Sequence, residues 1–338
     1  MLVGIVVRTK NRNSLLLRAL SGIAKQSYAN WFLVIVNDGG DVDSLDSAVA
    51  AWHNQYSDRI KPDQYTVVHN RQSLGVSGAA NTGLAALPKT DFIALHDDDD
   101  FWPQTFLAES VAEFLKQEQF YKIKQLSMVV SPVDWVEEEI RICESDRPVH
   151  RIIEEQKKSF PDQLEEGWVS LYDIIQANRF PPIAVLMNAH VVSEVGIFRT
   201  DLPVLEDWEF FIRLLMKGDA YVRGGTPAQY RVRPKSTSHE GNSITVSRTL
   251  HLSTRRLLEN EWLRQDLESG KMGLGTLIAQ YRSFQAGNPI ETAILRELRQ
   301  GGLLRDGKAF ARAIRRGIRF LSLAELPEWT KPLLLSER

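Results

Sequence analysis

Short apolar runs alternate with segments of helical spacing along the N-terminal third of the chain. The runs are rich in Val, Ile, Leu and Phe, and they predict four strands, at residues 2–7, 31–38, 65–70 and 91–97. Between them, apolar side chains recur every three or four residues, as they do in amphipathic helices. Strand and helix in regular alternation predict an α/β fold, in which a mostly parallel sheet is flanked by helices.

The pattern changes in the second part of the chain. Residues 128–180 show no consistent period, and an apolar strand and a helix return within residues 179–198. Residues 206–218 are typical of an amphipathic helix with acidic residues in its first turn. Residues 229–243 predict a strand that runs into a polar loop, and from about residue 245 the pattern is mainly helical. This organisation predicts one α/β domain over residues 1–244 and a helical C-terminal extension over residues 245–338.

Polar residues directly follow each of the four predicted strands. They are Thr9 to Arg12, Asp38-Gly39, Asn70-Arg71 and Asp97 to Asp100. The carboxyl ends of parallel strands lie at the same edge of a sheet, and ligands bind in the crevice outside that edge. We therefore expect these residues to converge on one binding crevice.

Four consecutive aspartates, Asp97 to Asp100, stand where the last of these strands ends. One interpretation is an acidic turn that opens a helix, since carboxylates are favourable near a helix N-terminus. An EF-hand is excluded, because a loop that starts at Asp98 has Pro103 at its sixth position, where glycine is required. The third interpretation is a site for Mg²⁺ or Mn²⁺, whose charge would remove the repulsion between the carboxylates and help to hold a diphosphate.

The composition is that of a globular protein, with 43% hydrophobic and 25% charged residues in a chain of 338. The net charge of −2 gives no signature of nucleic-acid binding. A single cysteine, Cys143, excludes an intramolecular disulfide and a cysteine-based zinc site. The sequence has neither a signal-peptide pattern nor an apolar run of about 18 residues, so we expect a cytoplasmic protein.

Five segments stand in a fixed order along the chain: "VVRTKNR", "VNDGGD", "NRQSLGVSGAANTGLAAL", "FIALHDDDDFW" and "LEDWEFFIRL". Their order and rough spacing resemble those of family 2 glycosyltransferases, over about residues 1–240. These are inverting enzymes of the GT-A fold, a Rossmann-like nucleotide-binding fold, and they use nucleotide-activated sugars. The resemblance implies a nucleotide-sugar-binding half at residues 1–110 and an acceptor-binding half at residues 111–244.

The resemblance also implies which residues contact the donor. Those that match the family pattern are Thr9, Asn11, Arg12, Asp38, Gly75, Ser77, Asn81, Asp97 and Asp98. Arg8 and Lys10 depart from the pattern, and Ala80 stands where arginine is common in relatives. The charge that this arginine would supply near the donor must then come from another residue, either Arg71 or a residue of the loop 231–239.

A divalent ion, Mn²⁺ or Mg²⁺, held by an Asp-X-Asp motif, is a further implication of the resemblance. Asp97 and Asp99 match that motif, and Asp100 stays open because the run permits a slip of one residue. His239 lies in a polar segment that relatives often place over the diphosphate, and it is either a further metal ligand or an ordinary loop residue.

In the family, a Glu-Asp pair at the start of a helix supplies the catalytic base. Asp207 matches the aspartate that removes the proton of the acceptor hydroxyl, and Glu206 supports it. The predicted activity is inverting transfer of a hexosyl or N-acetylhexosaminyl group from a UDP-sugar to a glycan or lipid-linked acceptor, as in polysaccharide biosynthesis. Two alternatives stay open. One is a nucleotide-sugar-binding module without catalysis, and the other is a metal-dependent nucleotidyl- or phosphoryl-transfer enzyme on a similar sheet.

The segment 305–320 is basic and amphipathic, with six basic residues, one acidic residue and apolar side chains at helical spacing. One interpretation is an interfacial helix on anionic lipid, which would place the protein at the inner face of the membrane. The other is a helix that packs on the catalytic domain or on a second copy of the chain in a homodimer.

Overall fold

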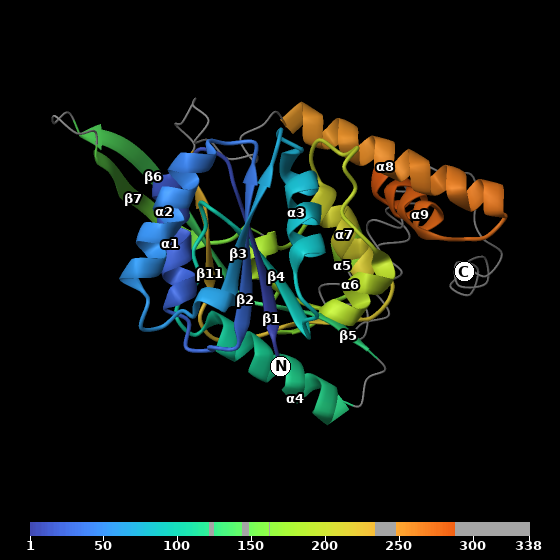
Figure 1. Ribbon diagram of the computed structural model, residues 1–338. Coiled ribbons are helices and arrows are strands. Elements are labelled where there is room, and N and C mark those ends of the chain that lie inside the picture. Colours follow the sequence, from blue (N-terminus) through green and yellow to red (C-terminus); the bar gives the residue numbers. More distant parts are fainter. Residues whose placement is uncertain (122–124, 144–148, 162, 234–247, 288–338) are drawn as a thin grey trace, which may run out of the picture. The chain divides into compact units, whose positions relative to one another are not determined.

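The computed structural model describes residues 1–121, 125–143, 149–161, 163–233 and 248–287 (Figure 1). The chain divides into two compact units, Met1–Arg255 and Arg256–Arg338. The candidate metal ligand His239 and the basic segment 305–320 lie outside the described residues.

The four strands predicted in the N-terminal third form one half of an eight-stranded sheet. These strands, β1 (Val3–Thr9), β2 (Trp31–Asp38), β3 (Tyr65–Asn70) and β4 (Phe92–Asp97), lie in the order β3-β2-β1-β4. Each pairs in parallel with its neighbour in that order. Every residue of β1 is buried, as expected for a strand covered on both faces. The predicted α/β class is confirmed.

Helices flank this half of the sheet (Figure 1). They are α1 (Asn13–Ala24), α2 (Val42–Gln55), α3 (Gly75–Ala86) and α4 (Phe106–Tyr121). The main apolar core joins Ile5 and Val7 of β1 to Leu20 of α1. Against β1, α3 comes close at Gly83, where an added Cβ would lie 2.2 Å from Val6 Cγ1.

The other half of the sheet is mixed rather than parallel. Beyond β4 it continues through β9 (Val185–Asn188), β5 (Leu126–Val130), β10 (Asp219–Val222) and β8 (Gly167–Trp168). Strand β9 runs antiparallel to both β4 and β5. The helices here are α5 (Leu171–Gln176), α6 (Ala189–Val195) and α7 (Glu206–Leu215), with single 3₁₀ turns at Pro62–Gln64 and Pro182–Ala184 elsewhere in the chain. The strand and helix predicted within residues 179–198 and the helix predicted at residues 206–218 are confirmed.

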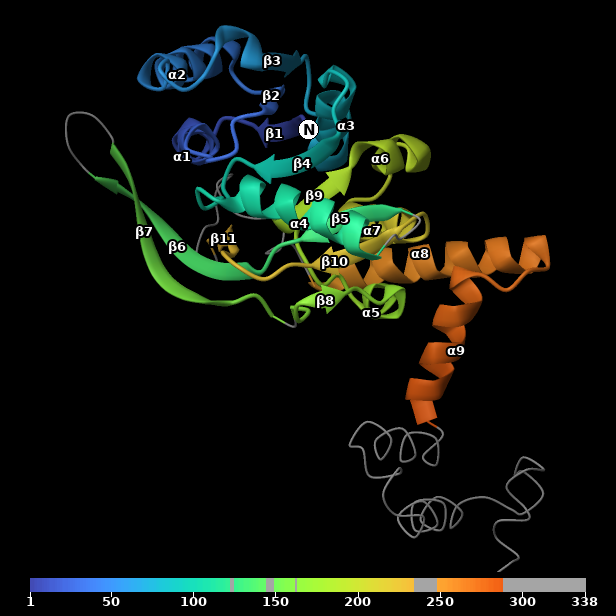
Figure 2. The same cartoon turned by 90° about the horizontal axis from the view of Figure 1, so that it is seen from below.

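A second, three-stranded sheet follows the order β11-β6-β7. Its strands are β6 (Val133–Cys143), β7 (Val149–Ser159) and β11 (Ala228–Val232). Strands β6 and β7 pair antiparallel and form a long two-stranded arm (Figure 2). The sequence did not predict this arm, because acidic residues occupy three successive positions of β6, Glu137 to Glu139, and hide the alternation that marks a strand. Of these, Glu138 is buried.

Part of the predicted helical extension is described. Residues 248–287 form α8 (Arg248–Ser269) and α9 (Leu274–Gly287). Within the ranges that the structure describes, no helix combines the length and the apolar character needed to cross a bilayer.

Candidate active site

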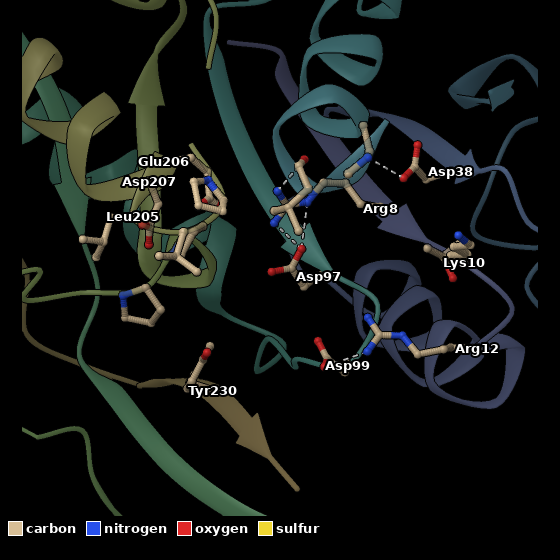
Figure 3. Close-up of a pocket in the computed structure, with 18 of the residues that line it drawn as sticks. Arg8, Lys10, Arg12, Asp38, Asp97, Asp99, Leu205, Glu206, Asp207 and Tyr230 are labelled. Carbon is tan, nitrogen blue, oxygen red and sulfur yellow. Dashed lines mark hydrogen bonds and ion pairs between the residues drawn. The ribbon is translucent and has the colours of Figure 1, made fainter. Parts of the chain in front are cut away.

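A cavity of about 770 Å³ lies at the carboxyl ends of β1, β2 and β4 and reaches the start of α7 (Figure 3). Its lining includes nine of the residues predicted from the sequence: Thr9, Asn11, Arg12, Asp38, Gly75, Asp97, Asp99, Glu206 and Asp207. Four others, Ser77, Asn81, Asp98 and Asp100, are buried or partly buried nearby but do not line it. The crevice expected at the strand ends is therefore present, and it brings the donor half and the Glu206–Asp207 pair to one space.

Two non-glycine residues on the cavity wall have a left-handed backbone. Asn11 has a φ of 55° and Leu205 a φ of 65°. This conformation is uncommon for residues other than glycine and asparagine, and such strain concentrates at functional sites. Because Leu205 immediately precedes Glu206, the strained turn fixes where α7 begins and where its first two carboxylates stand.

Arg8, one of the departures from the family pattern, points along the cavity toward Glu206 and Asp207 (Figure 3). Its Nε lies 2.8 Å from Asp97 Oδ1, and its Nη1 donates to the carbonyl of Val76 at 3.1 Å. Burial opposes the charged form, but Asp97, Glu206 and Asp207 raise the pKa of Arg8, so it stays a cation. Arg8 thus places a guanidinium group beside α3, the helix in which Ala80 stands at the position where relatives commonly have an arginine. The other candidate, Arg71, does not line the cavity.

Asp38 anchors the loop that leads into α3. Its carboxylate accepts hydrogen bonds from Asn70 Nδ2 at 2.9 Å, Ser73 Oγ at 2.7 Å, and the N–H groups of Leu74 and Gly75 at 2.8 and 3.0 Å. Burial alone would raise the pKa of Asp38, but these hydrogen bonds hold it below its usual value. The predicted contact between Asp38 and a nucleotide stays a prediction.

Asn81 has a structural role in the described geometry. Its amide exchanges two hydrogen bonds of 2.9 Å with the backbone of Phe198, and these tie α3 to the segment after α6. Ser77 is buried on the same helix. Neither side chain is brought together with the other predicted donor residues.

Arginine side chains pair with three carboxylates of the acidic row (Asp97 to Asp100), those of Asp97, Asp98 and Asp99. Asp98 is fully buried, accepts from Thr9 Oγ1 at 2.7 Å and forms an ion pair with Arg12. Asp99 contacts Arg12 Nη1 at 3.3 Å and also pairs with Arg233. Asp100 is buried and accepts from the backbone N–H of Arg231 at 2.8 Å. Guanidinium groups therefore offset part of the charge of the row, while burial and the neighbouring Asp99 raise the pKa of Asp98 to about 7 and that of Asp100 well above its usual value.

A further buried carboxylate, Glu138 of β6, extends this network. It accepts from Arg18 at 2.7 Å, from Arg231 at 2.9 Å and from Arg233 at 2.7 Å. The side-chain contacts thus join the carboxylates of Asp97, Asp98, Asp99 and Glu138 to the guanidinium groups of Arg8, Arg12, Arg18, Arg231 and Arg233. Sequence reasoning missed Glu138 and Arg18, because β6 itself was not predicted.

The described residues do not offer a ready set of ligands for a resident divalent ion. Of the four aspartates only Asp97 and Asp99 line the cavity, and each carboxylate is in contact with a guanidinium. Within the described ranges no cluster of three or more His, Cys, Asp or Glu side chains is arranged to hold a metal. An ion at Asp99 would have to compete with Arg233 for the same oxygen. The metal-ligand roles of Asp97, Asp99 and Asp100 stay predictions.

Glu206 and Asp207 form the opposite wall of the cavity (Figure 3). Asp207 accepts from Asn178 Nδ2 at 2.8 Å and from the N–H of Trp208 at 2.7 Å, so its orientation is fixed. Burial raises the pKa of Glu206 to about 7, and the neighbouring charge of Asp207 acts in the same direction. Burial also raises the pKa of Asp207, against the two hydrogen bonds. Two carboxyls with raised pKa values can accept a proton near neutral pH.

Comparison with known proteins identifies the N-terminal part of the chain. Residues 4–154 match the model of the family described as "Glycosyl transferase family 2". Over these residues the chain is similar to family 2 glycosyltransferases. The resemblance noted in the sequence is thereby confirmed, and the matched residues include the acidic row and most of the donor half of the cavity.

A curated relative of the chain is the Escherichia coli protein "UDP-Glc:alpha-D-GlcNAc-diphosphoundecaprenol beta-1,3-glucosyltransferase WfgD". The two are 31% identical over 115 residues, which are 34% of this chain and 42% of the relative. The chain spans less than half the length of the curated relatives that it matches.

Solved structures of S. aureus TarS share the fold. TarS 1–349 in complex with UDP has a TM-score of 0.54 and 14% identity, with 96% of this chain and 93% of that chain covered. The complex of TarS 1–349 with UDP-GlcNAc has a TM-score of 0.54 and 15% identity, with 78% and 67% covered. At this identity the likeness establishes the GT-A fold alone.

Proposed function

We propose that this protein is an inverting glycosyltransferase that moves a sugar from a nucleoside diphosphate donor, a UDP-sugar, to a hydroxyl group. The observation that carries the proposal is one cavity in which Glu206 and Asp207 face Arg8 and Asp97 from the opposite wall (Figure 3). The similarity to family 2 glycosyltransferases and the UDP-sugar in the name of the relative WfgD support the same donor class.

The proposed reaction is a single displacement. The acceptor oxygen forms a bond to the anomeric carbon of the sugar while the bond from that carbon to the diphosphate oxygen breaks. The electron pair of the broken bond leaves with the nucleoside diphosphate, and Asp207 takes the proton of the attacking hydroxyl. Because attack comes from the face opposite the leaving group, the configuration at the anomeric carbon inverts.

Asp207 is the better candidate for the base of the pair. Its two hydrogen bonds, from Asn178 and from the N–H of Trp208, hold one carboxylate geometry at the start of α7. They also favour the ionised form, which is the form that a base needs. Glu206 stands beside it with a pKa of about 7, and the two carboxyls titrate as a pair.

Cations for the departing diphosphate stand at the end of β1. Arg8, Lys10 and Arg12 all line the cavity on the donor side. Guanidinium groups bind phosphate oxygens through charge-assisted hydrogen bonds. The proposal contains no resident metal ion, because the cavity-lining carboxylates of the acidic row are paired with arginines.

The acceptor is proposed to be a glycan or a lipid-linked saccharide. Phe160, Phe180 and Tyr230 line the cavity, and aromatic rings can pack on the faces of sugar rings. The name of the relative WfgD includes a lipid-linked acceptor. An acceptor of that kind would bring the enzyme to a membrane surface, with the segment 305–320 as a candidate contact.

A thermal-shift panel of UDP-, GDP- and dTDP-sugars tests the donor assignment. We expect a UDP-sugar to raise the melting temperature more than the other two, and UDP to be released on incubation with acceptor extracts. A shift without any release of UDP would favour a binding module without catalysis. No shift with any of the three would contradict the proposed donor class.

A further inference from the structure

Asp99 is an acidic residue of the cavity wall that contacts two arginines, Arg12 and the buried Arg233. Its Oδ2 contacts Arg12 Nη1 at 3.3 Å and also receives Arg233 Nη2. The side chain of Arg233 is 1% exposed and that of Asp99 is 7% exposed. Asp99 therefore lines the cavity with a carboxylate whose negative charge is already paired with a buried arginine.

Arg233 is held at both ends of its guanidinium group. While Nη2 reaches Asp99, Nη1 donates to Glu138 Oε1 at 2.7 Å, and the side chain of Glu138 is fully buried. A buried ion pair that loses one partner leaves an uncompensated charge, which is strongly unfavourable. Replacement of Arg233 by an ion at Asp99 would therefore require a buried guanidinium to give up one of its two carboxylates.

We propose that Arg233, together with Arg12, takes the place at Asp99 that a divalent ion would take, so that this protein binds a nucleoside diphosphate without a divalent ion. This inference rests on the proposed function, because it concerns the same donor site. Arg233 acts here as a positioning residue: it does not line the cavity, and it acts through Asp99.

The physical reason is the charge that a diphosphate meets on entering the cavity. An unpaired Asp99 would repel it, whereas an Asp99 paired with Arg233 and Arg12 leaves Arg8 and Lys10 on the cavity wall to attract it. In most metal-dependent nucleotide sites the ion both neutralises the carboxylates and binds the phosphates. In this cavity the two tasks are divided between a buried arginine and the cations on the wall.

Calorimetric titration of the unaltered full chain with UDP, once in EDTA and once in Mn²⁺, tests the inference directly. We expect the two dissociation constants to agree within about threefold, which is a small difference in binding free energy. Binding that requires Mn²⁺ would overturn the inference and leave the proposed function standing.

The variant Arg233→Met tests the role of this residue. We expect it to bind UDP at least about tenfold more weakly in EDTA, and Mn²⁺ to restore binding, because the ion can then reach Asp99. Arg233→Lys should retain binding in EDTA, since it keeps the charge.

Arg231→Met is the matched control: Arg231 also pairs with Glu138, but its side chain has no ion pair with Asp99 among the described contacts. A loss of UDP binding in Arg233→Met that Mn²⁺ leaves unchanged would indicate a merely structural role and overturn the inference.

Titration with Mn²⁺ alone, followed by electron paramagnetic resonance, separates this inference from the choice of nucleotide. We expect Arg233→Met to bind the ion at least about tenfold more tightly than the unaltered protein. Failure of UDP to bind in either buffer would contradict the proposed donor, and equal Mn²⁺ affinity of the two proteins would then overturn the inference about Arg233.

Discussion

Single carboxylates in this cavity differ in the partners that they have. Asp97 and Asp99, the members of the acidic row that line the cavity, contact guanidinium groups, whereas Asp207 is bonded to neutral donors, Asn178 and the N–H of Trp208. A guanidinium in contact with a carboxylate opposes its protonation, while neutral donors oppose it less. This difference supports the proposal that the Glu206–Asp207 pair transfers the proton.

The pH dependence of transfer follows from the raised pKa values of this pair. The base must be ionised, so kcat should be low at pH 5.5 and rise with pH through about 7, where the pKa of Glu206 lies. Replacement of Glu206 by Gln removes the like charge beside Asp207, and we expect the midpoint of the profile to move to lower pH. A profile that is flat between about pH 5.5 and 8.5 in the unaltered protein would contradict a carboxyl base.

Residues of the site were predictable only where the sequence carries a local pattern. Thr9, Arg12, Asp97 and Asp207 stand in recognisable segments, and all of them are found at or beside the cavity. The pairing of Asp99 with Arg233 joins residues 134 positions apart. Charge pairing over that separation depends on how the two sheets pack, which no local pattern records.

Among the elements, the parallel strands were the most predictable. Strands β1, β2 and β4 are largely buried, and their apolar runs give a clear signal, while the half-buried β3 gives a weaker one. The arm formed by β6 and β7 gave no such apolar signal, because Glu138 occupies a buried position that an apolar residue would normally fill. A charged residue can occupy that position because three arginines surround it.

Close packing of α3 on β1 gives a prediction at this scale. Gly83→Val adds atoms where even a Cβ would lie 2.2 Å from Val6 Cγ1, so the helix must shift. We expect a loss in the free energy of unfolding of about 1–3 kcal/mol or more, measured by urea denaturation. Ala85→Ser, at an exposed position of the same helix, should change stability by less than about 0.5 kcal/mol. Equal stability of the two variants would show that α3 does not pack on β1 as described.

For the whole of residues 1–255, the arginine–carboxylate network is the feature that joins the two sheets. Arg8 lies on β1 and Arg18 on α1, while Glu138 and Arg231 come from the three-stranded sheet. Burial alone would raise the pKa of Glu138, but the arginines hold it below its usual value. The contribution of this carboxylate to stability is therefore present at neutral pH and is lost as the pH falls through its depressed folded-state pKa.

Glu138→Gln tests the network as a structural element. It leaves three arginines without their shared buried carboxylate, so we expect a loss of about 3–5 kcal/mol in the free energy of unfolding at pH 7. Glu137→Gln is the matched control, since Glu137 is the adjacent residue of β6 and pairs with the half-exposed Lys158. If both variants unfold at the same urea concentration, the network does not join the two sheets.

The central claim is that one cavity binds a nucleotide sugar and that Asp207 removes the proton of the acceptor. Its most direct test is to measure sugar transfer and donor binding separately in Asp207→Asn, with Asp201→Asn, an exposed aspartate of the preceding loop, as control. We expect transfer to fall at least about a hundredfold while the dissociation constant of the donor changes less than about threefold. Transfer at the full rate in Asp207→Asn, with donor binding intact, would contradict the claim.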